Sequence, residues 1–191
     1  MNKLVCITGL CGAGKSQVSD YLVNNKHFQF LRFGQLTLDE VKKRGLPPSE
    51  ALEREIREEL RRKYGMAAYA LLNLPKIKEL LKLGNVVGDG LYSFEEYKVL
   101  REEFPTALVV VAVYAPPQLR YARISARISG QEDQDIRNRP LSVSDAQKRD
   151  IAELENLNKG ATIAMADYTL INTGSLQTLF QDLETLVANI K

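Results

Sequence analysis

The sequence predicts a three-layer α/β/α sandwich built on a five-stranded parallel sheet. Short runs of apolar and β-branched residues alternate with longer segments of helical periodicity, which is the pattern of parallel strands joined by helices. The chain has 191 residues, of which 45% are hydrophobic and 26% are charged, as in an ordinary globular domain. Because we find no internal repeat and no linker, we expect one domain over residues 1–191.

The five expected strands are short apolar segments, each followed by a helical pattern. They are residues 4–8, 28–33, 85–88, 107–114 and 168–171. The segment 107–114 is apolar on both faces, which is typical of a central strand in a parallel sheet. Helices on both sides of the sheet would bury these strands.

Helical patterns fill the intervals between the strands. We expect helices at residues 15–25, 36–44, 49–64, 66–83, 93–103, 116–129, 142–158 and 175–190. Pro75 is expected to interrupt the fourth of them, because proline lacks the N–H that a helix interior uses. Ser93 and Glu96 predict a capping box at the start of the fifth.

The composition excludes several classes of protein. Lysine and arginine total 26 against 24 acidic residues, a net charge of +2. This charge does not indicate the basic surface that binds nucleic acid, so we expect no such partner. Cys6, Cys11 and the single His27 lack metal-ligand spacing. No apolar run approaches the ~18 residues of a membrane span, and residues 4–7 are too short for a signal peptide. We expect a cytoplasmic protein without a membrane partner, and the sequence leaves its oligomeric state open.

Residues 9–16 match the phosphate-binding motif G-x-x-x-x-G-K-[ST], between the first strand and the first helix. Its glycines allow backbone N–H groups to point at an anion, and the N-terminus of the following helix adds further donors. We expect Lys15 to contact the β- and γ-phosphates of ATP and Ser16 to bind Mg²⁺. The expected nucleotide-binding residues of this loop are Gly9, Leu10, Cys11, Gly12, Ala13, Gly14, Lys15, Ser16 and Gln17. The motif predicts a P-loop NTPase fold; the alternatives are a glycine turn without a ligand and, for Cys11, a redox-sensitive thiol.

Asp89 follows the apolar run at residues 86–88, where a P-loop protein carries an acid on the magnesium side of its site. We expect Asp89 to bind the metal or its water, or to accept a proton from the attacking group. The structural alternative is a simple turn, since Asp89 precedes Gly90. The presence of the P-loop favours the role at the metal.

Arginines are concentrated after the fourth strand, where phosphoryl transfer would need positive charge. Three of them share one face of the expected helix at 116–129, with spacings i, i+3 and i+7: Arg120, Arg123 and Arg127. Arg137 and Arg139 lie in the polar, aperiodic segment 130–141, which we interpret as a lid loop that closes over the triphosphate. A solvated face, paired with the acids of that loop, is the alternative.

Further arginines are candidates for binding an acceptor phosphate. One is Arg32, which ends the second strand, and another is Arg57, Arg61 or Arg62 in the helical segment 53–63, whose mixed charges otherwise indicate a solvated face. We select Arg32 and Arg61. We expect the helical segment 36–84 to form an insertion on the acceptor side of the site.

These motifs together resemble the nucleoside-monophosphate-kinase branch of P-loop proteins. Pro116-Pro117, the alanine–arginine pairs at 122–123 and 126–127, and the segment 166–176 are similar to dephospho-coenzyme-A kinase. The segments 32–46 and 60–65 resemble an uncharacterised archaeal family of adenylate-kinase-like and dephospho-coenzyme-A-kinase-like proteins. The matching segments span nearly the whole chain.

The resemblance implies an ATP- and Mg²⁺-dependent transfer of the γ-phosphoryl group, a reaction of the EC 2.7 class, to a small nucleotide-like acceptor. It implies that Arg123 and Arg127 lie at the donor phosphates or adenine, and that the segment from Asn172 to Ser175, which includes Gly174, lies beside the adenine ring.

Two departures from the families leave the acceptor open. Gln35 stands where dephospho-coenzyme-A kinases carry the acid that activates the acceptor hydroxyl, and an amide cannot act as a general base. Residues 90–93 contain no arginine, although adenylate kinases carry one after the acid of the third strand.

Two functions are therefore open. The first is a small-molecule kinase that uses ATP and a nucleoside monophosphate, dephospho-coenzyme A or a similar acceptor, with Lys15, Asp89, Arg123 and Arg127 as catalytic residues. The second is a nucleotide-dependent binding or switch protein with weak ATPase activity and a protein or RNA partner. The missing acceptor acid and the charged helix 53–63 favour the second.

Overall fold

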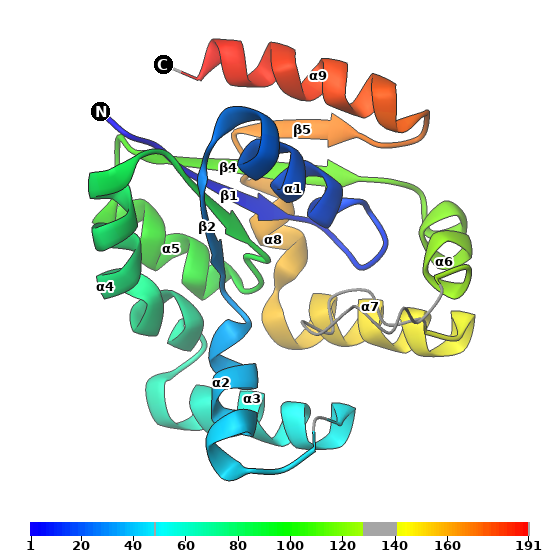
Figure 1. Cartoon of the computed structure of the whole chain (residues 1–191). Coiled ribbons are helices and arrows are strands. Elements are labelled where there is room, and N and C mark those ends of the chain that lie inside the picture. Colours follow the sequence, from blue (N-terminus) through cyan, green and yellow to red (C-terminus); the bar gives the residue numbers. More distant parts are fainter. Residues whose placement is uncertain (48, 128–140, 191) are drawn as a thin grey trace.

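The structure, a computed structural model, describes residues 1–47, 49–127 and 141–190. Its centre is one sheet of five parallel strands (Figure 1). The strands are β1 (Leu4–Thr8), β2 (Gln29–Arg32), β3 (Val86–Asp89), β4 (Leu108–Tyr114) and β5 (Tyr168–Ile171). Their order across the sheet is β2-β3-β1-β4-β5. This arrangement confirms the predicted fold class.

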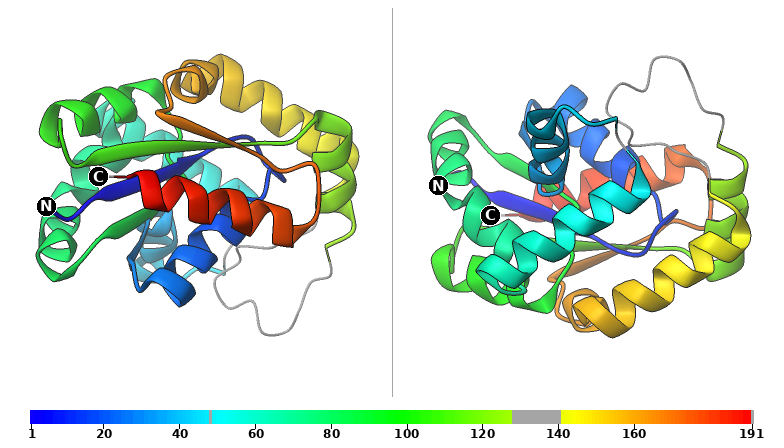
Figure 2. Two further views of the ribbon diagram at one scale, coloured as in Figure 1. Left: turned by 90° about the horizontal axis from the view of Figure 1, so that it is seen from above. Right: turned by 90° about the horizontal axis from the view of Figure 1, so that it is seen from below.

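Helices cover both faces of the sheet (Figure 2). They are α1 (Lys15–Lys26), α2 (Gln35–Arg44), α3 (Glu50–Tyr64), α4 (Ala68–Leu83), α5 (Phe94–Glu103), α6 (Pro117–Ser125), α7 (Val143–Leu157), α8 (Lys159–Ala164) and α9 (Leu176–Asn189). None of these helices, within the described part of the chain, is long and apolar enough to cross a membrane.

The alternation of side chains along β1 divides the core into two halves. Leu4 and Cys6 point to one face, where they pack with buried residues of α4 and α5. Val5 and Ile7 point to the other face, where they pack with buried residues of α1 and α9. Since both faces are buried, the strand is apolar throughout, as a central parallel strand requires.

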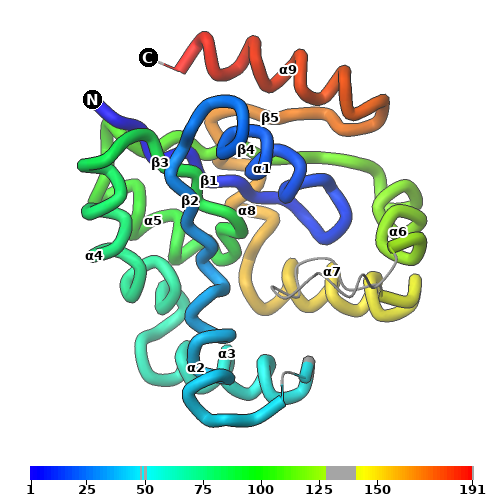
Figure 3. Tube along the Cα trace, in the orientation of Figure 1, coloured from blue at the N-terminus to red at the C-terminus, as the bar shows by residue number. Residues whose placement is uncertain are grey.

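The carboxyl ends of the parallel strands meet at one end of the sheet, and the loops that follow them gather there. The chain trace in Figure 3 shows the loop after β1 at this end and both termini at the other. The projecting part of the segment 36–84 is α2 and α3, whereas α4 packs against the sheet. The loop end therefore faces α3 on one side and α6 and α7 on the other.

Three local predictions are wrong. Pro75 does not interrupt α4, because apolar residues on both sides of it, such as Tyr69 and Ile77, are anchored in the core and offset the cost of the lost hydrogen bond. The helix α6 ends at Ser125, so Arg127 lies beyond the helix rather than on one face of it with Arg123.

The third error concerns the end of the segment 142–158. Asn158 adopts a left-handed conformation, with φ of 48°, which ends α7 and redirects the chain into α8. The helix α8 was not predicted, because its six residues are too few to show a periodic pattern. Most of the predicted lid, including Arg137 and Arg139, lies outside the described residues.

Candidate active site

The P-loop connects β1 to α1, as the motif predicts, and its glycines adopt backbone conformations that other residues rarely reach. The φ angles of Gly9, Gly12 and Gly14 are 132°, 80° and 105°. Space is a second constraint, because a Cβ on Gly9 would lie 2.3 Å from the Val113 carbonyl oxygen, and one on Gly14 would lie 2.2 Å from Asn172 Nδ2. The glycines thus permit both the loop conformation and its close packing.

Replacing Gly14 with alanine is expected to destabilise the protein by ~2 kcal/mol or more, because strain at positive φ adds to the collision with Asn172. Gly45→Ala is the matched control: Gly45 has a φ of 66° but no atom within 4 Å of its added Cβ, so only the strain applies, ~1 kcal/mol. Urea unfolding of both variants measures the difference. Equal losses would show that the packing against Asn172 does not constrain the loop.

Lys15 points back onto the loop. Its Nζ donates hydrogen bonds to the carbonyl oxygens of Gly9, at 2.8 Å, and Leu10, at 3.1 Å. Burial, and next the charge of Lys159, lower the pKa of Lys15 from 10.5 to about 8. Its hydrogen-bond acceptors are neutral, whereas phosphate oxygens are charged and form stronger bonds with an ammonium group.

Asp89 lies at the carboxyl end of β3, where it pairs in register with Ile7 of β1. It is buried, and Ser19 Oγ donates to Asp89 Oδ1 at 3.2 Å. Ser16 is three residues before Ser19 on α1, so it shares the helix face that contacts Asp89. A hydroxyl and a carboxylate are oxygen donors that suit Mg²⁺, which completes its shell with phosphate oxygens and water. The predicted pair Ser16 and Asp89 therefore fits the metal.

A chain of hydrogen bonds joins the P-loop to the loop after β5 and to α6. Asn172, in the loop after β5, donates from Nδ2 to the Ala13 carbonyl oxygen at 2.8 Å. Arg123 Nη1 in turn donates to the Asn172 carbonyl oxygen at 3.0 Å. The fold thus places Asn172 against the P-loop and Arg123 against Asn172, and Gly174 is exposed two residues further on. Arg127, beyond α6, is partly buried.

Arg120 uses its donors inside the protein. The side chain is 3% exposed, and its Nη1 donates to the Cys11 carbonyl oxygen at 2.9 Å and forms an ion pair with Asp150 Oδ2 at 2.7 Å. These contacts link α6 and α7 to the P-loop, so Arg120 supports the loop rather than facing a ligand with Arg123.

An ionic cluster on α7 and α8, with Glu153 and Lys159 buried and Arg149 exposed, lies beside the P-loop, and no sequence pattern predicted it. Lys159 is fully buried, and its Nζ lies 2.6 Å from Glu153 Oε2. Arg149 Nε donates to the other oxygen of Glu153 at 3.0 Å. Although burial opposes it, the charges of Lys159 and Arg149 hold the pKa of Glu153 at about 2. No motif marks Lys159, because its neighbours along the chain carry no chemistry that would single it out.

The acceptor-side candidates are spread over neighbouring elements. Arg32, at the end of β2, pairs in register with Asp89 and so lies at the correct end of the sheet. The guanidinium of Arg61, on α3, lies 5.5 Å from the centre of the Tyr69 ring. Its Nε is buried and has no hydrogen-bond partner in the described ranges.

Glu96 is close to Arg61 and forms the predicted capping box of α5. Its Oε2 accepts hydrogen bonds from the backbone N–H groups of Tyr92, at 3.0 Å, and Ser93, at 3.2 Å. Its Oε1 is buried and has no hydrogen-bond partner among the residues that the structure describes. Burial raises the pKa of Glu96 from 4.5 to about 7, although the two backbone bonds oppose the rise.

The protein should lose stability as the pH rises from about 4.5 to 7, because the folded state keeps a proton on Glu96 that the unfolded state has released. At pH 8 the cost of the buried charge is up to ~3 kcal/mol. Glu96→Gln should flatten this slope in urea unfolding measured from pH 5 to pH 8. Glu95→Gln, on the same helical turn, is the control and should keep it, and an unchanged slope in Glu96→Gln would contradict the assignment.

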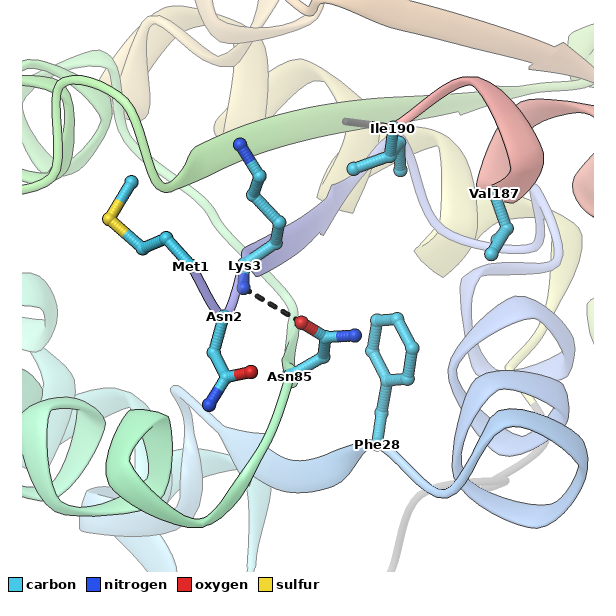
Figure 4. A pocket seen from close by; sticks show the side chains of 7 residues that line it. All are labelled: Met1, Asn2, Lys3, Phe28, Asn85, Val187 and Ile190. Atoms are coloured by element: carbon cyan, nitrogen blue, oxygen red, sulfur yellow. Dashed lines mark hydrogen bonds between the residues drawn. The ribbon is translucent and has the colours of Figure 1, made fainter.

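A cavity of about 300 Å³ lies at the other end of the sheet (Figure 4). It is lined by Met1, Asn2, Lys3, Phe28, Asn85, Val187 and Ile190. The backbone N–H of Lys3 donates to Asn85 Oδ1 at 2.8 Å, as Figure 4 shows. None of the expected site residues lines this cavity, so it is separate from the candidate active site.

The parallel sheet, the P-loop after its central strand and the acid after the neighbouring strand define a P-loop NTPase domain with a kinase-like fold. Residues 5–151 match the family described as the AAA domain. Over 189 residues the chain is 35% identical to a UPF0200 protein of Thermococcus gammatolerans, which covers 98% of this chain and 95% of that relative. The chain therefore belongs to the UPF0200 family, whose members include proteins of several archaea. The expected resemblance to an archaeal family of P-loop kinase-like proteins is confirmed.

Solved structures agree with this fold. A protein named TT1252 from Thermus thermophilus has a TM-score of 0.65 and 21% sequence identity, and the match covers 100% of this chain and 98% of that one. A shikimate kinase from Acinetobacter baumannii, in complex with shikimate, has a TM-score of 0.58 and 21% identity, with 100% and 96% covered. At this level of identity the likeness shows the fold alone.

Proposed function

We propose that the protein is an ATP- and Mg²⁺-dependent phosphotransferase that moves the γ-phosphoryl group to a small, nucleotide-like acceptor. The observation that carries this proposal is the position of Lys15 and Asp89. Lys15 begins α1, after the loop that follows β1, and Asp89 ends the neighbouring strand β3, close enough for its charge to act on Lys15. A phosphate-binding cation next to a magnesium-side acid is the arrangement that phosphoryl transfer uses.

Each residue of the site has a role in this proposal. The backbone N–H groups of the P-loop and Lys15 would hold the phosphates, and Ser16 and Asp89 would hold Mg²⁺, which neutralises phosphate charge. Arg123 and the loop containing Asn172 and Gly174 would border the nucleoside. Arg32 and Arg61, on the other side, would bind an anionic group of the acceptor.

The structural neighbours support a small acceptor. One is the shikimate kinase described above, and another is a gluconokinase of Sinorhizobium meliloti with a TM-score of 0.57 and 16% identity. Both names describe enzymes that phosphorylate small molecules. Gln35 offers no base here, because an amide does not take up a proton near neutral pH, and its Nε2 donates to Asp39 Oδ1 at 3.0 Å.

An assay of ADP release over a panel of acceptors tests the proposal. The panel contains the nucleoside monophosphates, dephospho-coenzyme A, shikimate and gluconate. We expect one of them to stimulate ADP release above the basal ATPase rate in the presence of Mg²⁺, and EDTA to abolish the stimulation. A rate that no acceptor changes would count against the kinase.

The alternative is a nucleotide-dependent binding or switch protein with weak ATPase activity. It is supported by the exposed, mixed-charge surface of α3, where Arg54 and Glu58 form an ion pair at 2.9 Å in solvent. In this case a protein or RNA partner would stimulate hydrolysis and no small acceptor would do so. Stimulation by RNA must weaken as salt is added, because phosphate contacts release counterions.

A further inference from the structure

Lys159 has an environment that differs from that of an ordinary buried lysine. Its ammonium is 0% exposed, bonds to Glu153 at 2.6 Å and lies 4.6 Å from the centre of the Tyr92 ring. Tyr92 belongs to the loop that follows Asp89, so Lys159 lies at the carboxyl end of β3. The first residue of α8 is thereby placed beside the candidate active site.

Lys159 is also close to the P-loop. Its charge acts on the ammonium of Lys15, and so does the charge of Glu153. Glu153 is at the same time bonded to Arg149 at 3.0 Å. Glu153 is thus bonded to two cations, Lys159 and the exposed Arg149, while Asp89 is a second acid whose charge acts on Lys15. Because Lys159 shares its one bonded carboxylate with another cation, a phosphate oxygen suits it as a further acceptor.

A second observation points to a ligand at the same place. Thr162 lies three residues after Lys159, on the same face of α8. Its hydroxyl is fully buried and has no hydrogen-bond partner within the described residues. A buried hydroxyl without a partner is rare in proteins, and the spacing from Lys159 places this one on the helix face where a ligand or its water would lie.

We propose that Lys159 is a second phosphate-binding lysine, which donates to a phosphoryl group lying beyond the β-phosphate at the P-loop. That group is either the γ-phosphoryl of the donor or a phosphate of the acceptor. The proposal rests on the proposed function and deepens it.

The bonds of Glu153 make the movement of Lys159 feasible. When the ammonium of Lys159 turns from Glu153 to a phosphate oxygen, Arg149 keeps its bond to the other carboxylate oxygen. The buried carboxylate is then still paired, which avoids most of the penalty for an isolated charge. If Lys159 instead serves only to join α7 to α8, its removal should lower stability and leave ligand affinity unchanged.

Calorimetry with three probes separates these roles: MgADP, a non-hydrolysable ATP analogue with Mg²⁺, and inorganic phosphate added to the ADP complex. If Lys159 binds the donor's γ-phosphoryl, Lys159→Met should lower the affinity for the ATP analogue by ~10-fold or more and leave the affinity for MgADP unchanged. If Lys159 binds an acceptor phosphate, the same variant should lower the affinity for inorganic phosphate by a similar factor, while both nucleotides bind as before. Lys159→Arg, which keeps a cation at this position, should recover most of the loss.

Two further variants keep the proposal testable if Lys159→Met folds poorly. Glu153→Gln releases Lys159 from its counterion and should strengthen binding of the affected probe, a gain that a structural role does not produce. Arg101→Met is the matched control, because it breaks the ion pair with Asp167 at 2.8 Å away from the site. It should lower stability without changing any of the three affinities.

The proposal is overturned if Lys159→Met changes neither the preference for the ATP analogue over MgADP nor the affinity for phosphate. If Lys159→Met does not fold, the same result for Glu153→Gln overturns it. Failure of the proposed function looks different, because no acceptor would then stimulate ADP release, whereas the effect of Lys159→Met is measured by binding alone. If the wild-type protein bound neither nucleotide, inorganic phosphate alone would be the probe, and its affinity should still fall in Lys159→Met.

Discussion

Lys15→Ala is expected to lower the affinity for MgATP by on the order of 100-fold or more, because it removes the charged donor to the β- and γ-phosphates. The fold should survive, since Lys15 Nζ donates to backbone carbonyl oxygens of its own loop. Calorimetry with MgATP measures the affinity, and thermal unfolding measures the stability.

The direction in which Lys15→Ala changes the stability of the protein can be predicted. Burial and the charge of Lys159 lower the pKa of Lys15 from 10.5 to about 8, so below pH 8 the folded protein carries the cost of the charged group. The unfolded state binds more protons only between pH 8 and 10.5, where that cost is relieved as the pH rises. At pH 7 the alanine variant should therefore be at least as stable as the wild type.

Lys26→Ala is the control for the loss of a lysine from the same helix. Lys26 lies at the other end of α1, where it forms an ion pair with Glu184 at 2.5 Å. The variant Lys26→Ala should lower the stability of the protein slightly and leave MgATP binding unchanged. Wild-type affinity in Lys15→Ala would remove the P-loop from the proposed mechanism.

Asp89→Asn is expected to reduce the Mg²⁺-dependent rate by on the order of 100-fold or more, while nucleotide still binds. The amide keeps the shape of the side chain and can still accept the hydrogen bond from Ser19, but it loses the charge that would hold the metal. Asp89→Asn should therefore lower the rate without unfolding the protein.

The test compares turnover at several Mg²⁺ concentrations with ADP affinity in EDTA. Asp39→Asn is the control, because Asp39 is exposed on α2 and bonds to Gln35. It should leave both quantities unchanged. A full rate in Asp89→Asn would show that another acid holds the metal.

Much of the fold could be predicted because its signals are local. The segments 4–8 and 168–171 coincide with β1 and β5, and Ser93 and Glu96 form the expected capping box. The P-loop is as local as a functional signal can be, since its residues are consecutive and its glycines are required by backbone geometry. Asp89 was predicted as a site residue in the same way, from an acid directly after an apolar run.

The rest of the site depends on residues that only the folded chain brings together. Arg120 bonds to the Cys11 carbonyl oxygen and to Asp150, and Asn172 bonds to the Ala13 carbonyl oxygen, yet no pattern in the sequence connects these positions. Glu96 was predicted as a helix cap, and its burial and the consequent rise of its pKa follow from the packing around it.

The sequence by itself determined the strands, most of the helices and the phosphate-binding loop. Each of these follows from backbone preferences and side-chain periodicity over a few consecutive residues. Only the tertiary structure decided that Lys159 lies against Tyr92 and beside the P-loop, because this contact depends on the order of the strands and on the turn at Asn158. Side chains distant along the chain meet through packing, and the sequence around each of them does not encode the partner.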